Sequence, residues 1–234
     1  MINEQKAVPL RTGANRELRV QSVFSTIQGE GPYGGMPAIF VRLYGCNLQC
    51  PACDTDYTSN NEPMTPNELV SDIHEFGNVP LVVITGGEPF RQKEQLRPFV
   101  DRMRRSHIVQ IETNGTYYDQ SIANMANVDI VISPKTAFVH VSWKLKGTLD
   151  NVTWKYVLDH KHVDHTDGLP SDVLRTGIRP ARPPAWMPNH KVFLQPIDMQ
   201  DEEYNKMSQD CAVKSAMMFG YRFNLQVHKL INFP

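Results

Sequence analysis

Three cysteine thiols lie close together in the segment Cys46-Asn-Leu-Gln-Cys50-Pro-Ala-Cys53. A structural zinc site needs four closed ligands, so a fourth would have to come from Cys211 or from a remote histidine. A [4Fe–4S] cluster held by three cysteines leaves one iron open to a small molecule, which suits catalysis. The spacing favours the cluster and leaves zinc as an alternative. Three unrelated core cysteines are disfavoured, because Gly45 and Pro51 indicate a loop.

A second candidate motif, Thr85-Gly86-Gly87-Glu88-Pro89, follows the next apolar run of the chain. Glycines allow another backbone to approach closely, and a carboxylate can pair with an ammonium group. Such a sequence alone is equally typical of a turn that ends a strand. Its position one strand after the cysteines gives it weight as part of a site.

Short apolar runs alternate with helical segments along the chain and predict the elements that position these motifs. A helix is expected to start at Thr65, with Pro66 in its first turn and Glu68 completing a capping box. Strands are predicted at 38–44, 81–85, 108–113, 129–133, 154–158, 191–195 and 222–227, and further helices at 92–105 and 201–219. This order favours an α/β sheet or an open barrel, with functional groups at the carboxyl ends of its strands.

The composition of the 234-residue chain excludes several classes of protein. A net charge of −1 argues against a nucleic-acid-binding protein, which normally carries an excess of positive charge. No apolar run approaches the ~20 residues that span a bilayer. The N-terminus lacks the apolar stretch of a secretory signal, and four cysteines in an apparently cytosolic chain are not expected to form a disulfide framework. We therefore expect a cytoplasmic protein with no nucleic-acid or membrane partner.

One domain, 1–234, is expected, with a loop insertion at about 159–190 that is rich in proline and histidine. His160, His162 and His165 lie near its start, and a solvated loop is favoured over a metal site. Cys211 falls within the last predicted helix, where we expect it to pack as a small apolar residue.

Together, the cysteine and glycine motifs resemble the signature of the radical S-adenosylmethionine (SAM) enzymes, whose fold is a partial, open β/α barrel. More specifically, an ordered series of short pieces from about Val23 to the C-terminus resembles the 7-carboxy-7-deazaguanine synthases. The pieces are Phe24–Gly31, Pro37–Leu43, Cys53–Thr55, Glu112–Gly115, Ser133–Lys135, Leu194–Ile197 and Gln226–Lys229. The 159–190 insertion lies outside this resemblance.

The resemblance implies conversion of 6-carboxy-5,6,7,8-tetrahydropterin to 7-carboxy-7-deazaguanine and ammonia, a lyase step toward queuosine-type 7-deazapurines. It implies a [4Fe–4S] cluster, SAM and Mg²⁺ as cofactors, with SAM regenerated in each turnover. It also implies a reducing electron donor such as flavodoxin or ferredoxin, and a homodimer.

Site residues follow from the resemblance position by position. Cys46, Cys50 and Cys53 correspond to the cluster ligands, and Thr55 to a magnesium ligand. The SAM-binding positions are Gly87, Glu88, Glu112, Ser133, Pro134, Lys135, Gln195, Pro196 and Ile197. The substrate-binding positions are Ile27, Gln28, Gly29, Glu30, Arg42, Thr85, His228 and Pro234. The guanidinium fork of Arg42 suits a substrate carboxylate, with a structural ion pair as the alternative.

The sequence departs from the family where many members carry an aromatic residue immediately before the third cysteine. Ala52 stands there, so some stacking surface near the adenine is missing. Two other functions are weighed beside the synthase: a glycyl-radical-enzyme activase, which shares the cluster spacing, and a non-catalytic zinc-binding module. The activase leaves the 27–31 stretch unexplained, and the zinc module leaves the glycine motif unexplained.

Overall fold

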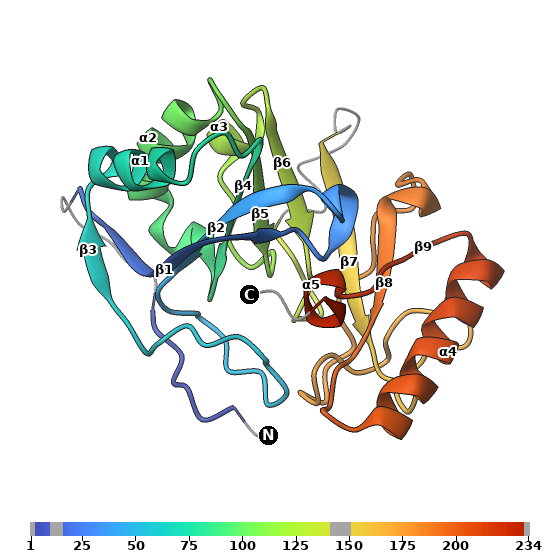
Figure 1. The fold of residues 1–234 in the computed structure, drawn as a ribbon. Coiled ribbons are helices and arrows are strands. Elements are labelled where there is room, and N and C mark those ends of the chain that lie inside the picture. Colours follow the sequence, from blue (N-terminus) through green and yellow to red (C-terminus); the bar gives the residue numbers. More distant parts are fainter. Residues whose placement is uncertain (1–2, 10–15, 141–150, 232–234) are drawn as a thin grey trace.

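A computed structural model describes residues 3–9, 16–140 and 151–231. Its described residues form an open nine-stranded sheet in the order β3-β1-β2-β4-β5-β6-β7-β8-β9 (Figure 1). The strands are β1 (Leu18–Ile27), β2 (Pro37–Leu43), β3 (Glu62–Met64), β4 (Leu81–Gly86), β5 (Ile108–Thr113), β6 (Val128–Ile132), β7 (Val152–Leu158), β8 (Val192–Pro196) and β9 (Arg222–Phe223). The predicted α/β sheet with the form of an open, partial barrel is confirmed.

Strands β2 and β4 to β9 run parallel, whereas β1 is antiparallel to β2 and β3 is antiparallel to β1. The parallel strands read as apolar runs because both of their faces are covered. In β4, for example, Leu81 to Ile84 are all fully buried.

The described residues contain five α-helices, of which the first four connect strands and the last follows β9: α1 (Pro66–Glu75), α2 (Lys93–Met103), α3 (Gln120–Ala123), α4 (Glu202–Phe219) and α5 (Val227–Leu230). Figure 1 shows α1, α2 and α4 outside the curved sheet, and α5 inside it. The predicted capping box is present: the Thr65 hydroxyl accepts from the Glu68 N–H, and the Glu68 carboxylate accepts from the Thr65 N–H. No helix in the described part of the chain is long and apolar enough to cross a membrane.

Two features of the sheet differ from the sequence prediction. Strand β1, the longest of the sheet, was not predicted, because much of it is only half-buried and its apolar residues do not alternate cleanly. The predicted strand at 222–227 is reduced to Arg222–Phe223, because the chain then turns into α5. Val227 N–H donates to the Gly29 carbonyl at 3.4 Å, which directs this turn toward the end of β1.

The 159–190 segment has the irregular backbone expected of a loop, but it is solvated only in part. Leu169, Val173 and Met187 are buried, and Leu169 and Met187 belong to the main hydrophobic core. Cys211 lies on α4 and packs partly buried against the same core, as predicted.

Candidate active site

A cavity of about 330 Å³ lies where the parallel strands end. Such a position is expected, because parallel strands bring their carboxyl ends to one edge of the sheet. Most residues predicted from the resemblance line it: Gln28, Glu30, Arg42, Cys46, Cys50, Cys53, Thr55, Thr85, Gly87, Glu112, Ser133, Lys135, Gln195, Pro196, Ile197 and His228. Ile27, Gly29, Glu88 and Pro134 do not line it, and Pro234 lies outside the described residues.

The cysteine loop follows β2 and places three free thiols in the cavity wall. Cys46 and Cys50 are buried and Cys53 is half-buried. Burial raises the pKa of the Cys46 thiol to about 12, because a buried thiolate without a positive partner is costly. A bound metal reverses this balance, since a coordinating thiol is deprotonated.

Backbone contacts tie this loop to the glycine motif at the end of β4. Gly87 N–H donates to the Leu43 carbonyl at 3.2 Å, and Glu88 N–H donates to the Gly45 carbonyl at 3.0 Å. A Cβ on Gly87 would lie only 2.1 Å from the Gly45 oxygen. Gly87 is therefore required for the two strand ends to touch, whatever it binds.

The Glu88 carboxylate does not face the cavity but joins the ends of β4 and β5. It accepts from the Thr113 hydroxyl at 2.9 Å, from Asn114 N–H at 2.8 Å and from Phe90 N–H at 3.0 Å. Burial raises its pKa to about 7 in spite of these hydrogen bonds. The resemblance predicts contact with SAM at this position, whereas the observed contacts are to the protein itself.

Residues 3–9 contact the outer side of the cysteine loop, and the sequence did not predict these contacts. Asn3 N–H donates to the Pro51 carbonyl at 2.8 Å, and Asn3 Nδ2 donates to the Cys50 carbonyl at 3.1 Å. Gln5 Nε2 donates to the Thr55 carbonyl at 2.8 Å, and Val8 N–H donates to the Cys46 carbonyl. These contacts use backbone groups and the side-chain amides of Asn3 and Gln5, so no sequence motif predicts them.

A buried cluster of charges occupies another part of the cavity wall. The Lys155 ammonium forms an ion pair with Glu30 and lies 3.7 Å from a Glu112 carboxylate oxygen. Gln226 Nε2 donates to Glu30 at 2.7 Å. Burial alone would raise the pKa of Glu30, but the charge and hydrogen bond of Lys155 outweigh it and hold that pKa well below its ordinary value.

Glu112 of this cluster also contacts two side chains, Thr85 and Gln28, that the resemblance assigns to substrate binding. Its carboxylate accepts from Thr85 Oγ1 at 3.3 Å and from Gln28 Nε2 at 3.4 Å, in addition to Gln110 Nε2 at 2.9 Å. Lys155 was missed from the sequence, although a lysine between Trp154 and Tyr156 in an apolar strand is a usable signal.

The 27–30 stretch reaches the cavity from the opposite edge of the sheet. Because β1 is antiparallel to β2, Ile27 pairs with Pro37 at the start of β2, far along the strand from the cysteine loop. His228 lies over this stretch, and a Cβ on Gly29 would lie 2.0 Å from its Nδ1 atom. Glycine at position 29 therefore lets α5 close over the end of β1.

Two buried polar atoms in the wall lack partners among the described residues, namely Arg42 Nε and Gln195 Oε1. Buried polar groups are normally satisfied, so a donor and an acceptor left open here suit a polar ligand. Within the described ranges, no three His, Cys, Asp or Glu side chains are arranged around a single metal ion. A cubane cluster does not require such a group, because each thiolate binds a different iron.

Replacing Gly87 with alanine is expected to separate the ends of β2 and β4. The added Cβ overlaps the Gly45 carbonyl, and overpacking of this kind costs about 1–3 kcal/mol of unfolding free energy. We expect a lower thermal midpoint, and several-fold less iron bound after anaerobic treatment with iron and sulfide. Gly34→Ala is the matched control, because its Cβ would meet atoms only at 3.6 Å and beyond. Equal iron contents in both variants would contradict this role.

Lys155→Met is expected to leave Glu30 and Glu112 buried without their positive partner, at a cost of about 3–5 kcal/mol. In the parent protein the pKa of Glu30 is held low. The ionised Glu30 therefore stabilises the fold by a constant amount at any pH above the ordinary pKa of a glutamate, and this stabilisation is lost only as the pH falls below that ordinary pKa. In the variant, burial raises this pKa, so stability falls as the pH rises from 5 to 8. Thermal midpoints across that range check the sign, with Lys155→Arg as the charge-preserving control. Parallel profiles for the Met variant and the parent would refute it.

Comparison with known proteins identifies the family. Residues 27–151 match the family model described as a 4Fe-4S single cluster domain. The chain is 39% identical to the 7-carboxy-7-deazaguanine synthase of Rhodospirillum rubrum, with 94% of each chain covered. It is 34% identical to that of Rickettsia prowazekii, with 94% of this chain and 90% of the relative covered.

The fold is also similar to a crystal structure of QueE from Escherichia coli. The TM-score is 0.61 at 23% identity, with 90% of this chain and 94% of that chain covered. The likeness covers most of this chain and supports the open architecture. Because this sequence similarity extends over nearly the full length of the chain, the chain belongs to the 7-carboxy-7-deazaguanine synthase family.

Proposed function

We propose that this chain is a radical SAM lyase that converts 6-carboxy-5,6,7,8-tetrahydropterin to 7-carboxy-7-deazaguanine with loss of ammonia. Family membership supports the reaction, and one observation carries it to this chain. A single cavity contains both the three-cysteine loop and the buried cluster of Glu30, Glu112 and Lys155. Such a cavity can bring a redox cofactor and a polar ring system together.

Cys46, Cys50 and Cys53 would hold a [4Fe–4S] cluster, and the free thiols and their shared loop fit this group. When bound, the cluster and SAM would supply one-electron radical chemistry at the substrate. Asn114 Nδ2 lies 3.9 Å from the Cys46 sulfur, where it orients the ligand.

SAM is proposed to lie along the residues that line the cavity beside the cysteine loop. These are Gly87, Glu112, Ser133, Lys135 and the 195–197 turn, with Pro134 shaping the turn that carries Ser133 and Lys135. The Lys135 ammonium donates to the Ser133 carbonyl at 2.9 Å, which fixes this turn. The open Gln195 Oε1 is an acceptor available to a ligand donor. Glu88 is proposed to act by holding the glycine motif in place.

The pterin is proposed to bind among the charged and amide side chains on the other side of the cavity. Gln28, Glu30 and Thr85 offer the mixture of donors and acceptors that reads the edge of a planar heterocycle. Ile27 and Gly29 contribute through the backbone that carries Gln28. Arg42 Nε is a buried donor without a partner in the described chain, which suits the substrate carboxylate. His228 closes this end of the cavity.

Mg²⁺ is proposed to bind at Thr55, which lines the cavity beside Asp54. The Thr55 hydroxyl lies 3.5 Å from Asp54 Oδ1, so a hydroxyl and a carboxylate oxygen are both close. A magnesium ion at such a partial site completes its octahedron with water and substrate oxygens.

An electron donor of the flavodoxin or ferredoxin kind, a homodimeric state and a cytoplasmic location are also proposed. The family resemblance supports the donor and the dimer. Four unpaired cysteines, three of them gathered in one loop, support a reducing compartment.

The decisive test is turnover by anaerobically reconstituted protein. With reductant, SAM, Mg²⁺ and 6-carboxy-tetrahydropterin, we expect 7-carboxy-7-deazaguanine by mass spectrometry, and SAM consumed far below the amount of product. SAM cleavage without any pterin product would favour the activase and reject the synthase. One zinc and no iron per chain would reject the radical mechanism.

Thr55→Ala is expected to raise the Mg²⁺ concentration that half-saturates product formation by about tenfold or more, the scale of losses near metal sites. Saturating Mg²⁺ should restore most of the rate. Thr58→Ala is the control on the same loop, because its hydroxyl donates to Gln5 and does not line the cavity. A parent enzyme whose rate is unaffected by a chelator would remove the magnesium assignment.

A further inference from the structure

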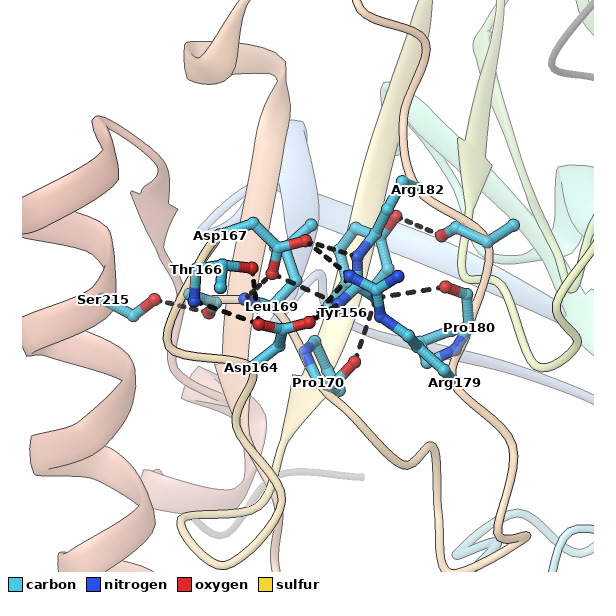
Figure 2. Close-up of polar contacts among 12 residues, drawn as sticks. Tyr156, Asp164, Thr166, Asp167, Leu169, Pro170, Arg179, Pro180, Arg182 and Ser215 are labelled. Carbon is cyan, nitrogen blue, oxygen red and sulfur yellow. Dashed lines mark hydrogen bonds and ion pairs between the residues drawn. The ribbon is translucent and has the colours of Figure 1, made fainter.

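The 159–190 segment, predicted as a loop insertion, is held together by contacts among its own residues. Two of its parts are joined by ion pairs (Figure 2). Arg182 Nε lies 2.6 Å from Asp167, and Arg179 Nη2 lies 2.7 Å from Asp164. Arg182 Nη1 also donates to the Pro170 carbonyl at 2.9 Å. Arginine is suited to this role, because its fork satisfies carboxylates and carbonyls together.

The same unit is fastened to the barrel at several points. Ser215 of α4 donates to the Gly168 carbonyl, and Tyr156 of β7 donates to the Ala181 carbonyl at 2.6 Å (Figure 2). Leu169, only 1% exposed, anchors the segment in the main core. A segment held by both polar and apolar contacts has a fixed position relative to β7 and α4.

The tip of the segment has an unusual backbone. Leu174 and Arg175 both adopt positive φ angles, of 49° and 61°, which side chains other than glycine rarely adopt. Val173 N–H donates to the Ile178 carbonyl at 3.0 Å, and Gly177 N–H donates to Asp172 Oδ1 at 3.0 Å, which closes the turn. Strain of this kind persists only where surrounding contacts impose it, and it gathers at binding sites.

The strained tip meets the cysteine loop inside the candidate site. The Leu174 carbonyl accepts from Ala52 N–H at 3.1 Å, directly before Cys53. Leu174 lines the cavity together with Ala52, Cys50 and Cys53. The segment therefore adds an apolar residue to the wall where position 52 is only alanine.

We propose that Leu174 is a specificity-determining residue of this cavity, forming the apolar wall against which the flat base of bound SAM packs. This inference rests on the proposed function. SAM would place its amino-acid end at the cysteine loop, and along the same wall it would place its flat, weakly polar base. Its faces need apolar contact, which Leu174 supplies, while the Leu174 carbonyl fixes the turn that carries Ala52 and Cys53.

Binding of SAM to cluster-loaded protein without reductant tests this role, because no turnover occurs. Leu174→Ala removes the wall but keeps the carbonyl contact, and we expect a dissociation constant for SAM about tenfold higher. Leu174→Met keeps the apolar volume and should restore binding to near the parent value. Ile178→Ala is the matched control, because this side chain lies on the same turn, is 38% exposed and does not line the cavity. The KM for the pterin should change little in all three variants.

Hydrogen exchange on the parent protein supplies a test that does not depend on the folding of a variant. SAM should slow exchange in peptides that cover 173–178 as well as in those that cover 50–55. Protection of the cysteine loop alone, or equal SAM affinity in Leu174→Ala and the parent, would overturn the role of Leu174.

These results separate the two proposals. A parent protein that binds SAM and forms the deazaguanine product, with Leu174→Ala unchanged in affinity, rejects the inference and keeps the function. A parent protein that binds SAM with the expected Leu174 dependence but leaves the pterin unconverted keeps the inference about the SAM wall and rejects the synthase. A parent protein that binds no SAM rejects both.

Discussion

The close backbone contact between the ends of β2 and β4 is the constraint on which the site depends. Gly87 and Gly45 approach so closely that no side chain fits between them. This contact fixes where the cysteine loop leaves the sheet, and therefore where all three thiols lie. Glu88, next in the motif, joins the end of β4 to the end of β5 through its buried hydrogen bonds. The glycine motif is a structural joint first, and its value for binding follows from that joint.

Around this joint, the cavity is completed by parts of the chain that are far apart in sequence. Residues 3–9 hold the outside of the cysteine loop, and α5 closes over Gly29 at the other edge. Between them, Lys155 contacts the carboxylates of Glu30 and Glu112 and holds the pKa of Glu30 low, which favours a polar ligand with a defined orientation. The charged cluster around Lys155 and the cysteine loop thus differ in chemistry but line the same cavity.

Much of this arrangement was predictable, because it depends on local signals. The strand at 108–113 and the helix start at Thr65 follow from apolar runs and from a capping side chain that acts within one turn. The cysteine and glycine motifs were found for the same reason. Strand β1, residues 3–9 and the partners of Lys155 depend on contacts between distant segments, so no local pattern specifies them. The tip at Leu174 was also hidden, because its positive φ runs against the preference of its residue type.

The two edges of the open sheet carry a consequence for the protein's behaviour in a crowded solution. An edge strand offers unpaired backbone groups on which another polypeptide can add a strand. Here the edge strands β3 and β9 are only three and two residues long. A closed barrel removes such edges but fixes the diameter of the hollow by strand number and stagger. By keeping its edges short instead, this sheet resists edge-to-edge aggregation and still leaves room inside its curve for α5 and a bound substrate.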